Sequence, residues 1–229
     1  MLFLAFSSVS TFASTIEIEG LYYDLNEETH TAVITGCNTN VTGTVIIPSN
    51  VNVSSVIYAV SSIAEKAFYN NYRIEGIFVC EGVISIGNDA FCGCSKLTTA
   101  LLPNSINTIG NGVFCNCHEL NSVTLPRDVI EIPRMMFYGC DHLSEIELPV
   151  GVRTISYGAF GKCGALLTLA LPDGLESIGQ EAFCESGLAS IHFPTSLKSL
   201  SYDSFSGCRG QKCHQGHETQ AAASQPIFQ

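Results

Sequence analysis

The chain has 229 residues, of which 46% are hydrophobic and only 14% are charged, and its formal net charge is -11. This composition excludes disorder over most of the length. The acidic balance excludes a surface for nucleic acid or anionic membranes, which needs clustered Lys and Arg. The length suits two globular domains or one elongated repeat array, and the internal pattern has to decide between them.

Residues 1–14 are apolar and then small, and Thr11-Phe12-Ala13 resembles a signal-peptidase site. A complete signal peptide has a basic n-region and usually about 15–30 residues, whereas this segment has no Lys or Arg. We interpret residues 1–14 as a truncated signal peptide; the alternative is an apolar first strand. No later stretch approaches about 18 consecutive apolar residues, so the sequence predicts no transmembrane segment.

Residues 15–73 contain short β-type runs separated by polar turns. They predict two or three hairpin-like strands and a degenerate first repeat that ends at Ala67-Phe68. Such strands cap the open end of a stack, which otherwise exposes apolar side chains and strand edges. Asn40 and Asn52 begin glycosylation sequons, which matter only if the chain enters a eukaryotic secretory pathway.

A repeat with a period of 23 residues organises residues 74–208 into six units. The phenylalanines that mark the repeat are separated by 23 residues, once by 22, and are Phe68, Phe91, Phe114, Phe137, Phe160, Phe183 and Phe205. Prolines keep the same step at Pro103, Pro126, Pro149, Pro172 and Pro194. Two independent markers on one period indicate a stacked repeat protein.

Each unit follows the pattern L-x-x-I-x-L-P-x-x-V-x-x-I-G-x-x-A-F-x-x-C, with small substitutions. The residues before each proline alternate between apolar and polar, which predicts a strand with one buried face that the proline ends. Stacking these strands gives a parallel sheet, and the V-x-x-I-G-x-x-A-F return arm turns its apolar side chains into the same interior. One isolated unit cannot offset its chain entropy, so only a stack is stable.

Eleven cysteines first suggest a disulfide framework or a metal site. Five of them share one repeat position, where Ser186 replaces the sixth, and are Cys94, Cys117, Cys140, Cys163 and Cys208. A residue used once per coil indicates a structural role, with the thiol packed inward at a turn. Stacked copies have Cβ atoms too far apart for easy bridging, so we expect free buried thiols in preference to disulfides between coils.

Two further cysteine patterns are candidates for zinc. Cys92 and Cys115 form C-x-C pairs with the repeat cysteines, but no second pair at metal-finger spacing accompanies them, and alternation predicts that one thiol of each pair points outward. The other candidate is the polar cluster Cys208, Cys213, His214 and His217. Ligand types without a scaffold do not define a site, so we predict no metal and no cofactor.

No catalytic motif of the hydrolase, metalloprotease or nucleotide-binding kinds is present, so the sequence predicts no enzyme and no catalytic residues. Glu145 and Glu147 share one strand face, where such pairs are usually a solvated surface.

The repeat pattern closely resembles the BspA-type leucine-rich repeat, a 23-residue subfamily, and the likeness extends over residues 16–208. The resemblance implies a repeat solenoid: a horseshoe-like, right-handed stack with a parallel β-sheet, short turns or 3-10 segments and an N-terminal β-hairpin cap. This chain departs from the pattern at Cys80 in place of proline, Pro133 in place of glycine and Ser186 in place of cysteine. Residues 209–229 lack the pattern and are predicted to be a polar, disordered tail.

Members of this family are commonly secreted or surface proteins of host-associated bacteria and some parasitic protists, typically with adhesive roles. The resemblance therefore implies a protein-binding module, extracellular or at the cell surface, whose partner is a host matrix or cell-surface protein. The predicted ligand-binding positions point outward from the sheet and are Thr99, Leu101, Ser122, Thr124, Glu145, Glu147, Thr168, Ala170, Ser190 and His192. The alternatives are an intracellular, cytoplasmic interaction scaffold and a spacer array from a longer surface protein.

Overall fold

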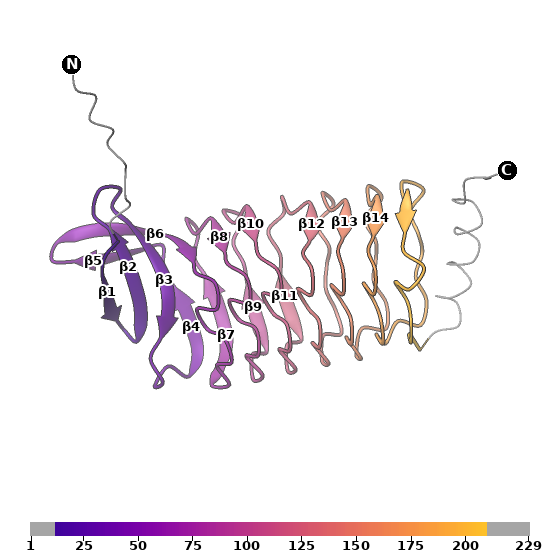
Figure 1. Ribbon diagram of the computed structural model, residues 1–229, viewed down its shortest axis with the longest axis horizontal. Helices are drawn as coiled ribbons and strands as arrows, with labels where there is room; N and C mark the ends of the chain where they lie inside the picture. The colour runs from indigo at the N-terminus through magenta and orange to yellow at the C-terminus, as the bar shows by residue number, and fades with distance from the viewer. Residues whose placement is uncertain (1–11, 210–229) are drawn as a thin grey trace, which may run out of the picture.

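The computed structural model describes residues 12–209, with side chains from residue 15 onward. These residues form fifteen strands and no helix. Figure 1 shows a cap of longer strands at the N-terminal end, followed by successive coils stacked along the long axis of the molecule. The chain is therefore a repeat solenoid, as the 23-residue period predicts.

The cap is a three-stranded antiparallel meander of β1 (Phe12–Ile18), β2 (Leu21–Asn26) and β3 (Thr31–Cys37). Alternate residues of β2 and β3 are buried, so the meander lays one apolar face on the first coil. β6 (Val56–Ile63) pairs parallel to β3 and forms a hairpin with β5 (Asn50–Val53). The strand β1 begins three residues before the predicted start of the cap, and residues 1–11 of the predicted signal peptide lie outside the described residues.

One side of the stack is a four-stranded parallel sheet in the order β11-β9-β7-β4, which we call the front sheet. It consists of β4 (Gly43–Ile47), β7 (Ile74–Val79), β9 (Thr99–Leu101) and β11 (Ser122–Thr124). β9 and β11 coincide with the alternating segments that precede the repeat prolines, and β7 directly precedes Cys80, which stands at the proline position. The prediction of a parallel sheet is correct for these coils.

The front sheet ends at β11, whereas the sequence predicts that it continues through every repeat. Within the described chain, the amides of residues 144–148 form no hydrogen bond with the preceding coil. Cross-strand contacts offer a physical reason, because the ordered strands align Ile46 with Phe78 and Phe78 with Leu101. The row continues to Thr124, which still pairs with Leu101, and the next residue in the row is Glu147, a charged residue type that is depleted in strands.

The other side of the stack carries two-residue strands on the return arms. β8 (Ser85–Ile86) and β10 (Thr108–Ile109) continue the sheet of the cap through β6. A separate sheet contains β12 (Glu131–Ile132), β13 (Thr154–Ile155), β14 (Ser177–Ile178) and β15 (Ser199–Leu200). Figure 1 shows these strands on the opposite side of the coils from β9 and β11.

Pro133 explains why the return-arm ladder is interrupted between β10 and β12. In other coils the residue after the second isoleucine donates its N–H to the preceding coil, as Gly110 does to Ile86 O at 2.8 Å. Pro133 occupies that position and has no N–H, so the corresponding bond to Ile109 cannot form. A pocket of about 430 Å³ lies at this break.

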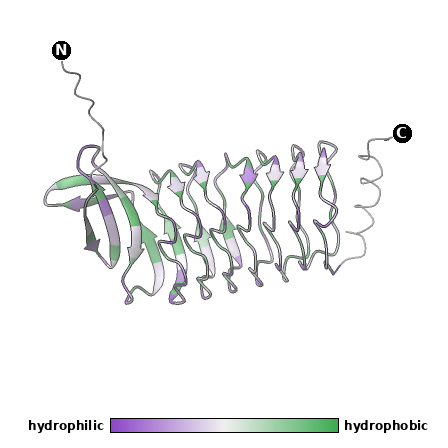
Figure 2. Cartoon of the chain, in the orientation of Figure 1, coloured by the Kyte–Doolittle hydropathy of each residue, from purple (hydrophilic) through white to green (hydrophobic). Residues whose placement is uncertain are grey.

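The core is a column of phenylalanines that runs through the stack. Seven rings, Phe68 to Phe205, are fully buried, and each stacks on the next with centroid separations of 5.1–5.9 Å. Figure 2 shows hydrophobic residues recurring from the cap through the successive coils. Each of the five inner rings therefore contacts the rings of both neighbouring coils. These contacts couple repeat units that are unstable in isolation.

The turns beside this column need left-handed backbone conformations, and at one of these positions asparagine and glycine alternate from Asn70 to Gly139. Gly139 has φ 73°, and a Cβ built there lies 2.5 Å from Oδ1 of Asn116 in the preceding coil. Asn116 itself has φ 57°, so the side chain of one coil fills the space that glycine leaves in the next.

We expect Gly139→Ala to lower the free energy of unfolding by about 1–3 kcal/mol, because alanine brings both backbone strain and a clash with Asn116. Lys162→Gly is the matched control, since Lys162 has φ 60° in the next coil and glycine relieves the strain there. Urea unfolding measures both variants. Equal stability of wild type and Gly139→Ala would contradict the role assigned to this turn.

Candidate functional site

The front face is the surface formed by the outward side chains of the front sheet and of the equivalent residues in later coils. Two rows cross it from coil to coil, because the strands pair in register. In β9 and β11 the middle residue is buried and its two neighbours point outward. All ten predicted binding residues are exposed or half-buried, with their ligand-binding role still a prediction.

The N-terminal part of the front face is apolar, which the sequence-based selection missed apart from Leu101. Ile46 is 63% exposed and Phe78 is 39% exposed, and their strands align them with each other and with Leu101. Both directly precede the buried last residue of their strand, and Leu101, which ends β9, directly precedes the buried Leu102. That shared position is the signal that identifies them, but Cys80 replaces the proline that marks it in later repeats.

The middle of the front face contains a groove of about 830 Å³ where the front sheet ends. Its lining includes five predicted binding residues, which are Ser122, Thr124, Glu145, Glu147 and Ala170. The groove also includes Arg127 and the apolar Val150, which is strongly exposed. Thr99, Leu101, Thr168, Ser190 and His192 do not line it. The front face thus changes from an apolar row to a groove of mixed lining, in which Glu145, Glu147 and Arg127 are the charged residues.

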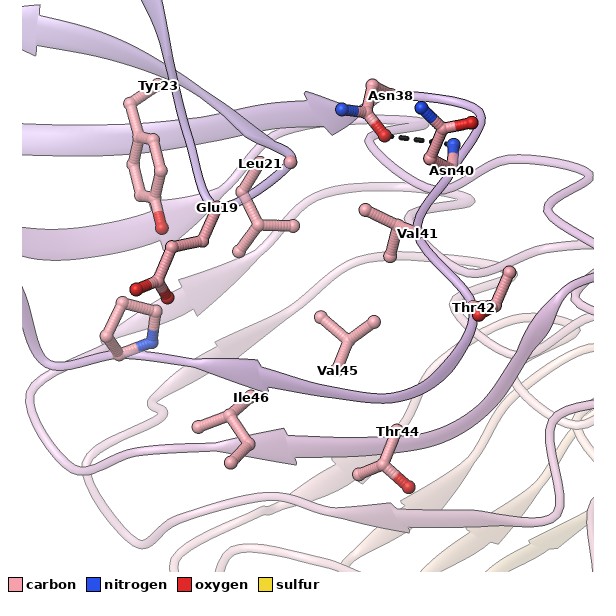
Figure 3. Close-up of a pocket in the computed structure, with 12 residues that line it drawn as sticks. Glu19, Leu21, Tyr23, Asn38, Asn40, Val41, Thr42, Thr44, Val45 and Ile46 are labelled. Atoms are coloured by element: carbon pink, nitrogen blue, oxygen red, sulfur yellow. Dashed lines mark hydrogen bonds between the residues drawn. The ribbon is translucent and has the colours of Figure 1, made fainter.

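A second pocket, of about 680 Å³, lies beside β4 at the junction of cap and front sheet. Figure 3 shows the β1–β2 turn and the loop after β3 on one side of it and β4 across from them. Val41 and Val45 provide apolar surface, and Asn40 provides polar atoms. Glu19 is the only charged residue in its lining. Burial, and secondarily the nearby Glu19, raise the pKa of Tyr23 to about 12, so its hydroxyl stays protonated at physiological pH.

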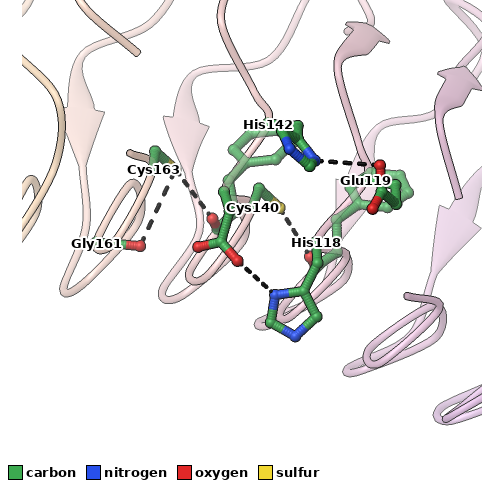
Figure 4. A network of polar contacts seen from close by, with 9 residues as sticks. His118, Glu119, Cys140, His142, Gly161 and Cys163 are labelled. Atoms are coloured by element: carbon green, nitrogen blue, oxygen red, sulfur yellow. Dashed lines mark hydrogen bonds and ion pairs between the residues drawn. The ribbon is translucent and has the colours of Figure 1, made fainter. Parts of the chain in front are cut away.

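The turns on the edge of the stack carry two crossed histidine–carboxylate pairs, shown in Figure 4. His118 Nδ1 lies 2.7 Å from Asp141 Oδ2, and His142 Nδ1 lies 3.1 Å from Glu119 Oε2. All four side chains are more than half exposed, and each pair joins two adjacent coils. Exposed pairs of this kind contribute about 0–1 kcal/mol, so they are minor links between coils.

The repeat cysteines are free thiols that make hydrogen bonds between coils. Cys140 Sγ donates to Phe114 O at 3.1 Å and Cys163 Sγ donates to Phe137 O at 3.1 Å, and the other three cysteines of this position make the same contact. All ten cysteines of the described residues are free. Burial raises the pKa of the Cys94 thiol to about 12 and that of the Cys140 thiol well above its usual range. These thiols are structural and poorly reactive.

The prediction that one thiol of each C-x-C pair points outward is wrong. Cys92 and Cys94 are both buried, as are Cys115 and Cys117. These residues lie in turns rather than strands, so the two-residue alternation of a strand does not apply to them. The Cys92 and Cys115 thiols also hydrogen-bond to each other across adjacent coils.

The remaining zinc candidate is divided between described and undescribed residues. The Cys208 thiol is buried and donates to Phe183 O at 3.0 Å, which fixes it within the stack. Cys213, His214 and His217 lie outside the described residues. Between residues 12 and 209, no group of three or more His, Cys, Asp or Glu side chains is arranged to hold a metal ion.

Over the same span, the structure contains no helix that is long and apolar enough to cross a membrane. Among curated proteins, no sequence matches the chain significantly. Solved structures do match it. A leucine rich cell surface protein from Faecalibacterium prausnitzii is 28% identical, with a TM-score of 0.72 over 86% of this chain. This chain covers 52% of that protein, or about half its length.

A leucine rich repeat protein from T. pallidum is 26% identical, with a TM-score of 0.77 over 90% of this chain and 95% of its own. A leucine-rich repeat protein from Eubacterium ventriosum, 23% identical with a TM-score of 0.69 over 82% of this chain and 50% of its own, shares the fold. The sequence itself matches the BspA type leucine rich repeat region in six copies, over residues 61–171 and 154–222. The chain therefore belongs to the BspA-type leucine-rich repeat family.

Proposed function

We propose that this chain is a non-enzymatic, adhesin-like module, secreted or at the cell surface, that binds host matrix or cell-surface proteins through its front face. The family is typical of bacterial surface proteins, and the Faecalibacterium relative is a cell surface protein. The observation that carries the proposal is the continuity of the front face, from the apolar row of Ile46, Phe78 and Leu101 to the groove beside Glu145 and Glu147.

These side chains are free to contact a partner because the core does not use them. Residues such as Ala100 and Val123 fill the interior, while their neighbours on the same strands point outward. An exposed aromatic ring among aliphatic side chains is a common anchor in protein interfaces. The groove next to it adds the charged side chains of Glu145, Glu147 and Arg127, so the face combines an apolar anchor with charged groups at its side.

An intracellular interaction scaffold is the second candidate. The ten free cysteines of the described residues favour it, because thiols persist in reducing compartments and pair readily in oxidising ones. Their burial weakens this argument, since the repeat cysteines are enclosed in the stack. A spacer array within a longer surface protein is the third candidate, and the Faecalibacterium protein motivates it, because this chain covers only 52% of that protein.

Binding of the full chain to immobilised fibronectin, fibrinogen and whole epithelial cells tests the proposal, by biolayer interferometry and an adhesion assay. We expect saturable binding that Phe78→Ser weakens roughly tenfold, because the change removes an apolar anchor. The triple variant Glu145→Ala/Glu147→Ala/His192→Ala tests the polar part of the face.

Ile130→Ala is the matched control, since Ile130 is 68% exposed on the return-arm side. Equal weakening by Ile130→Ala and Phe78→Ser would move the binding surface away from the front face. Absence of binding by the folded protein to all three targets would favour the scaffold or spacer.

A further inference from the structure

We propose that the free edge of β4 binds an extended, basic peptide segment of a partner protein, which adds to the front sheet as a further parallel or antiparallel strand. This inference rests on the proposed protein-binding function. It adds a second contact to the front face, made by backbone hydrogen bonds between β4 and the partner. β4 is the last strand of the front sheet, so its far edge pairs with no other strand of residues 12–209.

The backbone of β4 shows which groups are available. Gly43 N–H donates to Arg73 O, and Ile47 O accepts from Cys80 N–H, so both residues turn their backbone groups toward β7. Backbone groups of successive strand residues alternate between the two edges, so Thr44 and Ile46 direct theirs to the opposite edge. Within the described chain those groups form no hydrogen bond. An added strand supplies hydrogen-bond partners for the backbone groups of both residues.

The space beside this edge is a pocket of suitable form. The pocket of about 680 Å³ extends along β4 from Thr44 to Pro48 and is closed on its other side by the cap. Val45 is buried toward the interior, whereas Ile46 is exposed on the front face. Side chains of an added strand alternate in the same way, so one set packs near Val45 and Val41 and the other continues the row of Ile46 and Phe78.

Charge selects a basic segment over an acidic one. Glu19 is the only charged residue that lines the pocket, and it forms no ion pair within the described chain. The formal net charge of -11 adds a favourable long-range field for a cationic segment. A peptide with alternating apolar residues and a Lys or Arg within reach of Glu19 therefore fits both the lining and the field.

The β4 edge also differs from the other end of the same sheet. β11 spans three residues, whereas β4 spans five, so β4 offers the longer template for pairing. Long unpaired edges are usually covered or charged in natural proteins. Ile46 on the β4 edge is exposed and uncharged, so this edge lacks both kinds of protection. That agrees with an edge that remains available to a partner.

Three fluorescein-labelled eight-residue peptides test this proposal on the full chain by fluorescence anisotropy. They are an alternating lysine–valine peptide, the same peptide with glutamate in place of lysine, and the lysine–valine peptide with alternate backbone amides N-methylated. We expect binding by the first, and at least about tenfold weaker binding by the other two, because they lose the charge or the backbone bonds. Glu19→Gln should weaken binding of the lysine–valine peptide, and it should leave binding of the glutamate peptide unchanged or strengthen it.

Hydrogen exchange measured by NMR locates the contact. Bound lysine–valine peptide should slow exchange of the Thr44 and Ile46 amides, and Ile46→Pro should abolish binding, whereas Ile46→Val should retain it. Thermal unfolding verifies that Ile46→Pro is folded. The exchange measurement on the wild-type protein tests the proposal independently of this variant. Binding that tolerates N-methylation, or that leaves these two amides unprotected, would overturn the strand-addition proposal.

The two proposals fail in distinguishable ways. Loss of matrix or cell binding in Phe78→Ser together with no peptide binding would keep the proposed function and reject the β4 site. Peptide binding at β4 without matrix or cell binding would keep the β4 site and reject the adhesin.

Discussion

Phe137→Ala should lower the free energy of unfolding by about 3–5 kcal/mol. Phe137 is fully buried, and its ring lies 5.9 Å from that of Phe114 and 5.3 Å from that of Phe160, measured between centroids. Truncation to alanine therefore leaves a cavity between the rings of Phe114 and Phe160, which belong to the two neighbouring coils. Because each coil depends on its neighbours for stability, the effect reaches beyond the coil that is changed.

Urea unfolding followed by circular dichroism measures this effect, and the m-value reports whether the stack still unfolds as one unit. Phe137→Leu should cost less, because it retains much of the apolar volume. Ile130→Ala should change stability by no more than about 0.5 kcal/mol, since that side chain is exposed. A loss below about 1 kcal/mol for Phe137→Ala would contradict the continuous aromatic column.

The solenoid could be predicted because its core positions repeat. Phe and Pro on a common 23-residue step specify which residue of each coil turns inward and where each strand ends. The alternation in Ser122-Val123-Thr124 predicts a buried valine between two outward side chains, and β11 has that arrangement. Such inferences need only the period and the polarity of each position.

The front sheet ends after β11, and the return-arm ladder is interrupted between β10 and β12. Both interruptions depend on contacts between particular coils, which a consensus pattern for all repeats does not contain. Pro133 was recognisable as a departure from glycine, but its effect depends on the specific bond that the missing N–H makes in other coils. The end of the front sheet requires comparing side chains 23 residues apart, such as Thr124 and Glu147. Repeat position predicts where a side chain points, and the neighbouring coil decides whether the strands pair.

The candidate site was predictable in part for the same reason. The outward positions of the regular repeats follow from alternation, whereas Ile46 and Phe78 lie in the early coils, where the proline marker is displaced or replaced. The pocket beside β4 depends on how the β1–β2 turn and the loop after β3 meet that strand. These segments lie outside the repeat, so no periodic argument places them together.

The buried thiols make the second large prediction, a steep loss of stability above pH 9. Burial raises the pKa of Cys94 and Cys115 to about 12 from the ordinary value of 9.0, and it raises the pKa values of Cys117, Cys140 and Cys163 well above 9.0. In the unfolded chain these thiols ionise near pH 9, while the native state keeps them protonated. The unfolded state then binds fewer protons, so stability falls as pH rises.

Each such thiol should remove roughly 1 kcal/mol between pH 9 and pH 10, or about 5 kcal/mol for five, and little below pH 8. Urea unfolding at pH 7.5, 9 and 10 with a phosphine reductant measures the loss. Cys140→Ser should reduce it by about 1 kcal/mol, because a hydroxyl does not ionise in this range. Ser186 already fills this repeat position in one coil, so the stack accommodates the change. Stability that stays constant from pH 8 to pH 10 would show that the native state ionises these thiols freely, which would mean that the turns containing them are open to solvent.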